Sequence, residues 1–190
     1  MDADFSIELG QEDPVLDFPW TDPDGRISYF DLKRRPELLA RIEEANRFPE
    51  LHEFLRTVNS AISAVESAKC DAWTSDELSP EEDFFGASFK FVSYVDLVSS
   101  SECERQLLPT HQRFAKQLVE LLRQTPETPA STEICVRRAF YGPAGKTVEG
   151  FYFTIYISGY GDDEARARLN WEIALRLVAH AVLQLAALQQ

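Results

Sequence analysis

The residues of this sequence best suited to chemistry are tyrosines and cations at alternating positions of strand-like segments. In residues 147–160, Phe151 and Phe153 fall on one side of an extended chain, and Tyr152 and Tyr156 fall on the other. A tyrosine offers contact area and a hydroxyl group, and an arginine can grip a carboxylate through two hydrogen bonds. We therefore predict that this side binds an aromatic or anionic small molecule. The predicted ligand-binding residues are Lys90, Tyr94, Arg137, Tyr141, Tyr152, Thr154 and Tyr156.

The same tyrosines also have a structural interpretation. Tyrosine and threonine are preferred in any half-exposed strand. The N-terminal segment carries apolar residues such as Phe5, Ile7 and Trp20, so it is expected to lie against the body and could cover this side as a layer. The two interpretations differ in whether residues 1–35 leave a cavity beside the tyrosines.

No nucleophile or metal-ligand motif accompanies the tyrosines. Cys70, Cys103 and Cys135 are far apart and form no C-x-x-C pair, and the three histidines show no zinc spacing. The motifs G-x-S-x-G, H-E-x-x-H and G-x-x-x-x-G-K-[ST] do not occur. We therefore predict no catalytic residue, metal site or cofactor, and non-catalytic binding of a small ligand or a protein partner. The alternative is a small cofactor-independent hydrolase or isomerase that uses Tyr, Arg or Cys groups on the same side.

The negative charge is concentrated in two stretches of the chain. The chain has 32 acidic and 19 basic residues, for a net charge of −13, and residues 1–25 and 71–83 contain acids but no base. Such a distribution repels a phosphate backbone, which excludes nucleic acid as a partner. A basic protein partner remains an alternative, with the chain acting as an acidic inhibitor or immunity-type protein.

Length and composition indicate one soluble domain over residues 1–190, because 44% of the 190 residues are hydrophobic and can bury one core. No run of about 18 apolar residues predicts a membrane span. The N-terminus lacks the basic and apolar regions of a secretory signal, so a cytoplasmic location is expected.

Hydrophobic spacing predicts helices at 36–46, 109–125 and 161–188. Residues at steps of four and three predict a further helix from 49 to about 67, with a stripe made of Leu51, Leu55, Val58, Ile62 and Val65. Alternation predicts a short strand at 26–32, strands at 69–74 and 85–98, and a hairpin of 132–141 with 147–160.

This order predicts an α+β fold, in which helices pack on one face of a mainly antiparallel four-stranded sheet. Residues 1–35 are expected to form an acidic arm that packs on an α+β core at 36–190. From residue 48 onward the elements suggest two αββ units closed by a long C-terminal helix. An offset of about 64 residues carries Gly86 onto Gly150 and Phe89 onto Phe153, although two such units also arise without duplication.

The final helix is apolar on nearly every side. After Asn170 its polar residues are confined to one stripe, made of Glu172, Arg176, His180 and Gln184. Such a helix must be buried on most of its circumference, either at the centre of the domain or across a homodimer contact.

Overall fold

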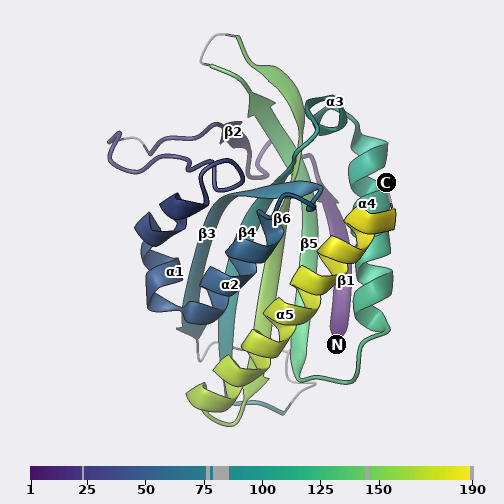
Figure 1. Cartoon of the computed structure of the whole chain (residues 1–190). Helices are drawn as coiled ribbons and strands as arrows, with labels where there is room; N and C mark the ends of the chain where they lie inside the picture. The colour runs from purple at the N-terminus through teal and green to yellow at the C-terminus, as the bar shows by residue number, and fades with distance from the viewer. Residues whose placement is uncertain (23, 76–77, 79–85, 144–145, 189–190) are drawn as a thin grey trace.

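The structure of the chain is a computed structural model that describes residues 1–22, 24–75, 78, 86–143 and 146–188. One sheet forms the centre of the molecule, and the longest helices lie on one of its faces (Figure 1). The strands are β1 (Asp2–Glu8), β2 (Leu16–Phe18), β3 (Val65–Ser75), β4 (Phe89–Ser99), β5 (Ala130–Tyr141) and β6 (Val148–Gly161). The helices are η1 (Pro36–Arg41, a 3-10 helix), α1 (Glu43–Arg47), α2 (Pro49–Val58), α3 (Glu102–Arg105), α4 (Leu108–Arg123) and α5 (Glu164–Leu188).

The sheet has six strands and is mixed, so the prediction of a four-stranded, mainly antiparallel sheet was incomplete. The strand order is β1-β5-β6-β4-β3, and β2 pairs with β5 beyond the end of β1. Strands β1 and β2 run parallel to β5, whereas all other neighbours are antiparallel. The arm therefore belongs to the sheet. Its acids alternate with residues such as Ala3 and Leu16, which become buried once the arm pairs with β5.

The main core lies between the sheet and the helices. Phe91 and Phe153 point into it from β4 and β6, whereas Tyr152 belongs to a separate cluster on the opposite face. The predicted segregation of phenylalanine from tyrosine is thus confirmed. From α2 onward, the order of helices and strands is also the predicted one, except that the short helix α3 (Glu102–Arg105) was not predicted.

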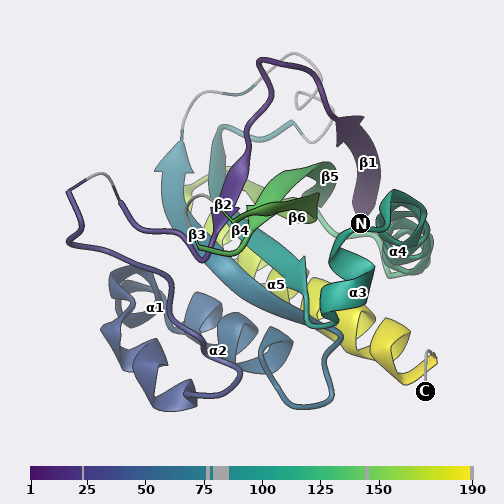
Figure 2. The ribbon, with the colours of Figure 1, turned by 90° about the horizontal axis from the view of Figure 1, so that it is seen from above.

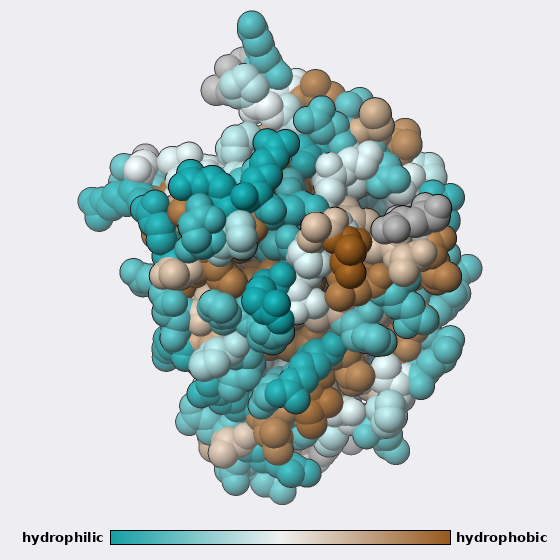
Figure 3. All heavy atoms as spheres, viewed as in Figure 1, coloured by the Kyte–Doolittle hydropathy of each residue, from teal (hydrophilic) through white to brown (hydrophobic). Residues whose placement is uncertain are grey.

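Helix α5 is buried by other elements of the same chain. It packs on β6 and β4, and α2 and α4 flank it (Figure 2). Leu169 and Ile173 stay exposed, and Figure 3 shows short apolar stretches between hydrophilic side chains on this side of the molecule. By length and composition α5 could cross a membrane, but half of its apolar window is buried against the rest of the chain. Its apolar coat therefore gives no separate argument for a homodimer, which stays a prediction.

The helix predicted at 49–67 ends at Val58, because Asn59 terminates it. The Asn59 amide nitrogen donates to the Leu55 carbonyl and to the Ser67 hydroxyl, and its carbonyl oxygen accepts from the Ser67 backbone nitrogen. Val65 already belongs to β3, and Ile62 is 63% exposed. The 3.6-residue spacing thus continued by coincidence across a turn.

Two shorter predictions also need correction. The helix predicted at 36–46 is divided at Ile42, whose backbone is extended. The strand predicted at 26–32 is not formed, and the segment makes one isolated bridge, between Thr21 and Ser28. Both segments pack against the rest of the chain, and there tertiary contacts outweigh the weak local preferences for helix and strand.

Candidate functional site

The arm covers one end of the sheet face opposite the helices. Tyr141 and Tyr152 are 9% and 3% exposed there, packed under Leu16 and Phe18 of the arm. The Tyr141 hydroxyl donates to the Phe151 carbonyl at 2.5 Å. These two predicted ligand residues thus belong to a second small core beneath the arm.

Next to the part covered by Leu16 and Phe18, the face carries a buried polar network centred on Thr154. The Thr154 hydroxyl donates to Asp96 Oδ1 at 2.7 Å and accepts from Arg137 Nη1 at 3.0 Å. The same guanidinium donates to Glu8 Oε2 at 2.7 Å and to the Tyr156 hydroxyl at 3.3 Å. Asp96, Arg137 and Thr154 are all less than 9% exposed, so the network is part of the structure of the face rather than an open surface.

The network shifts the pKa values of its acids in opposite directions. Burial raises the pKa of Asp96 to about 6, although the hydrogen bond from Thr154 and the charge of Lys69 lower it. Burial also raises the pKa of Glu8, but the hydrogen bond and charge of Arg137 outweigh it and bring the pKa below the ordinary value. The Asp96 carboxyl therefore titrates near pH 6 rather than near pH 4.

Asp96 and Glu8 were not among the predicted site residues. The available signals were local: Asp96 is the one acidic residue of strand β4, and Glu8 follows Asp4 and Ser6 at alternating positions. Neither signal indicates that the two side chains join one network, because β1 and β4 are not neighbours in the sheet.

An aromatic row crosses the uncovered part of the face. The ring centroids of Trp73 and Tyr94 are 6.5 Å apart, and those of Tyr94 and Tyr156 are 6.3 Å apart. The Arg137 guanidinium lies 5.6 Å from the Tyr156 centroid and ends the row. Burial raises the pKa of Tyr94 to about 12, so its phenol stays protonated at neutral pH. The structure thus brings together Tyr94, Tyr156 and Arg137 from the predicted set.

A shallow hollow of about 540 Å³ lies beside this row, with Trp73 and Tyr156 in its lining. We call it the lower hollow, and its lining contains the predicted residues Lys90 and Tyr156. The full lining in the described residues is Trp73, Ser75, Leu78, Lys90, Val92, Tyr156 and Ser158.

A second hollow, of about 500 Å³, lies between the arm, the α1 region and the edge strand β3. We call it the arm hollow. Aromatic and aliphatic side chains from all three segments line it, together with charged groups of both signs. They are Trp20, Arg26, Ile27, Ser28, Phe30, Leu32, Arg41, Ile42, Glu43, Glu44, Ser67, Ala68, Lys69, Cys70 and Tyr94.

Local structure holds the walls of the arm hollow in place. The arm folds back on itself, since the Tyr29 backbone nitrogen donates to the Trp20 carbonyl at 2.9 Å. The register of β3 shifts between Ser67 and Lys69. At that irregularity the Ala68 carbonyl accepts from Trp20 Nε1 at 2.6 Å, which fixes the indole ring beside the edge strand.

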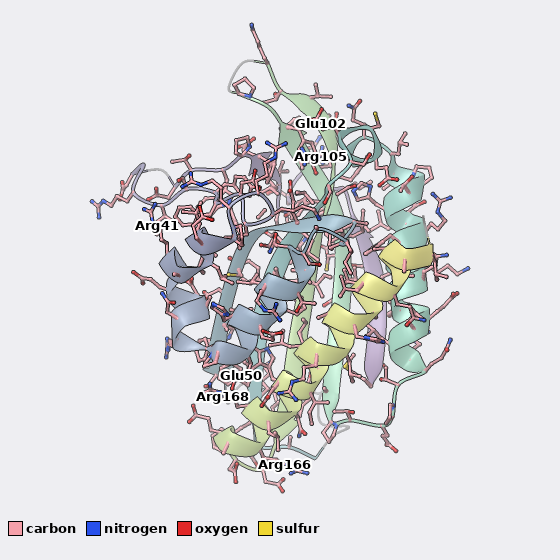
Figure 4. All side chains as sticks on the ribbon, in the orientation of Figure 1. Arg41, Glu50, Glu102, Arg105, Arg166 and Arg168 are labelled. Carbon is pink, nitrogen blue, oxygen red and sulfur yellow. The ribbon has the colours of Figure 1, made fainter. Side chains whose placement is uncertain are left out.

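Two cations lie on aromatic rings of this hollow. Lys69 Nζ is 4.8 Å from the Trp20 ring centroid, and Arg41 Cζ is 4.8 Å from the Phe30 centroid. Figure 4 shows Arg41 on the side of the molecule where the arm meets the first helices. The hollow therefore combines ring faces with positively charged donors.

One group of side chains has the composition of a metal site. Potential ligand atoms of Glu8, Glu133 and Cys135 lie within 4.8 Å of one another. Arg137 already pairs with Glu8 and adds a positive charge, and burial raises the pKa of the Cys135 thiol to about 12. A protonated thiol and an adjacent guanidinium both work against cation binding here.

On the helix side, a groove of about 470 Å³ separates α2 from α5. The Arg168 guanidinium meets the Glu50 carboxylate across it at 2.8 Å (Figure 4). The charges along this groove are thus partly neutralised within the chain.

Comparisons with family models, with curated proteins and with solved structures find no match to this chain. The sites described above are therefore the basis for its function.

Proposed function

We propose that the protein binds a small molecule in the arm hollow without transforming it. The observation that carries the proposal is that Trp20, Phe30 and Tyr94, from separate parts of the chain, line one hollow of about 500 Å³. Known small-molecule sites are of about this size, roughly 300 to 1,000 Å³, and combine an apolar or aromatic lining with a few polar groups. The lining of the arm hollow has the same character.

This proposal moves the predicted site towards the edge of the sheet. Of the seven predicted residues, Tyr94 lines the arm hollow, while Lys90 and Tyr156 line the lower hollow. The arm, which could have been a mere cover, supplies one wall. Tyr94 lines the arm hollow but not the lower hollow, and Tyr156 lines the lower hollow but not the arm hollow, so variants of these two residues distinguish the hollows.

The neutral, polarity-sensitive dye Nile red tests this proposal. We expect its fluorescence to rise when the dye binds the full chain. Ser28→Trp places a bulky side chain in the mouth of the arm hollow and should abolish the rise. Ser101→Trp, at an exposed position before α3, is the matched control and should leave it intact.

Two further variants locate the dye. Tyr94→Ala should weaken binding, whereas Tyr156→Ala, in the lower hollow, should not. Thermal unfolding of each variant checks that the fold is retained. Unchanged dye binding by a folded Ser28→Trp variant would contradict the proposal, as would a loss confined to Tyr156→Ala.

One observation favours an enzyme instead. Asp96 is buried, its pKa is raised to about 6, and it lies beside Thr154 and Arg137, as suits a general acid or base. Asp96 lines neither the arm hollow nor the lower hollow. The binding proposal therefore expects Asp96→Asn to leave ligand affinity unchanged, whereas an enzyme that uses Asp96 would lose turnover.

The acidic arm gives less support to an inhibitor of a basic protein. Glu8 pairs with Arg137, and Asp4 lies 3.7 Å from Arg123, so both charges are partly neutralised inside the chain. Most of the acidic stretch at 71–83 lies outside the described residues. This alternative requires association that weakens steeply with salt.

A further inference from the structure

The arm hollow contains ionic groups of both signs that are not paired with each other. Arg41 and Lys69 supply two positive charges, and Glu43 and Glu44 supply two negative charges. Within the described part of the chain, none of these four side chains forms a salt bridge within 4.0 Å. Arg26, also in the lining, does pair, with Asp24 at 3.7 Å.

The two cations are held where their donors remain available. Lys69 and Arg41 each lie 4.8 Å from a ring centroid. A ring face stabilises the charge of a cation but accepts few of its hydrogen bonds. A carboxylate that enters the hollow therefore meets N–H donors that no described carboxylate has taken.

The two carboxylates lie at the α1 wall of the same hollow. Both belong to the first turn of α1. The charge of Glu44 acts on Cys70 and on Tyr94, where it adds to the rise in their pKa values. Glu44 thus acts electrostatically on the β3 and β4 side of the hollow, where a bound ammonium group would be stabilised.

We infer that the ligand of the arm hollow is a zwitterion with an aromatic body, of the α-amino-acid class. This inference rests on the proposed function, because it names the ligand of the same hollow. A ligand with one charge would pair with the two side chains of opposite charge, but it would shield the two side chains of its own sign from water without giving them a counterion. A neutral ligand would shield all four charged side chains in this way. Covering a charge without a partner costs free energy, whereas a zwitterion pairs both signs at once.

Isothermal titration calorimetry of the full chain with four indoles tests this inference. The probes are tryptophan, a zwitterion; indole-3-propionate, an anion; tryptamine, a cation; and 3-methylindole, which is neutral. All four share one ring, so they differ mainly in charge. We expect tryptophan to bind roughly tenfold or more tightly than 3-methylindole, with the two singly charged probes in between.

Two double variants assign each charge to its site. Arg41→Gln with Lys69→Gln should weaken tryptophan and indole-3-propionate but not tryptamine. Glu43→Gln with Glu44→Gln should weaken tryptophan and tryptamine but not indole-3-propionate. The matched controls, Arg113→Gln with Lys116→Gln and Glu120→Gln with Glu127→Gln, alter exposed residues outside the hollow and should change no affinity.

The outcomes separate this inference from the proposed function. Equal affinity for tryptophan and 3-methylindole, or equal losses for all probes in both double variants, overturns the zwitterion and leaves small-molecule binding in place. If Nile red binds but none of the four indoles does, the zwitterion is likewise overturned and small-molecule binding stays in place. Failure of Nile red and of all four indoles to bind overturns both.

Discussion

The Arg137 guanidinium on β5 and the Glu8 carboxylate on β1 are separated by 129 residues in the chain and meet at 2.7 Å. Arg137 is 7% exposed. Strand β1 therefore completes the edge of the sheet and also supplies the counterion of a buried cation on the tyrosine-bearing face. The acidic arm is in this respect a structural part of the face.

Glu8→Gln should destabilise the chain by about 2 to 3 kcal/mol. It leaves the Arg137 charge buried without its carboxylate, and the full cost of about 3 to 5 kcal/mol is reduced because Glu8 remains partly exposed to water. Urea denaturation measures the loss. Asp4→Asn, which removes an exposed arm acid, should change the free energy of unfolding by less than about 0.5 kcal/mol. Equal losses for the two variants would show that the buried pair has no special role.

Asp96 should make stability fall as pH rises from about 4 to 6. Burial raises its pKa from 3.8 to about 6 in the folded chain, so over this range the folded state binds more protons than the unfolded state. At pH 7, the free energy of unfolding of Asp96→Asn should be up to about 3 kcal/mol higher than that of the unsubstituted chain. At pH 4 the two should be nearly equal. A less stable variant at pH 7 would mean that nearby cations fully stabilise the carboxylate.

The contact between Trp171 and Ser93 should behave as a coupled pair. Trp171 Nε1 donates to the Ser93 hydroxyl at 2.8 Å, and both residues are fully buried. Ser93→Ala leaves the indole N–H without a partner and should cost about 1 to 3 kcal/mol. In a Trp171→Phe background the same change should cost much less. Denaturation of the four chains gives the coupling energy, and a coupling near zero would contradict this contact.

Gly159 should tolerate no side chain. A Cβ at this position of β6 would lie 2.1 Å from the Trp171 backbone nitrogen, because α5 passes directly over the strand. Gly159→Ala should therefore cost about 3 kcal/mol or more. Gly10→Ala is the control, since a Cβ there meets mainly the flexible Asp13 side chain. Thermal unfolding compares the two, and a neutral Gly159→Ala would contradict the close approach of α5.

Several features of the fold and site followed from local pattern. Alternation separated Phe153 from Tyr152, and the apolar coat of α5 indicated extensive burial. Both patterns arise within one helix or strand, where spacing determines which side chains share a face. The tyrosine-bearing face was predictable for that reason.

Other features depended on which segments meet in space. The same 3.6-residue spacing that indicates a helix ran past Val58, and the side-chain hydrogen bonds of Asn59 to β3 ended the helix there. The ion pair of Arg137 and the burial of Tyr141 likewise required the arm to reach β5 and the sheet face.

The amino-acid sequence by itself determined the amphipathic faces of the central strands and of the long helices. Only the tertiary structure decided that the arm joins the sheet, that it buries Tyr141 and Tyr152, and that it forms a hollow with α1 and β3. The physical reason is that side-chain spacing specifies which face of an element is apolar, whereas the segment that covers that face is chosen by competition among all apolar surfaces of the chain.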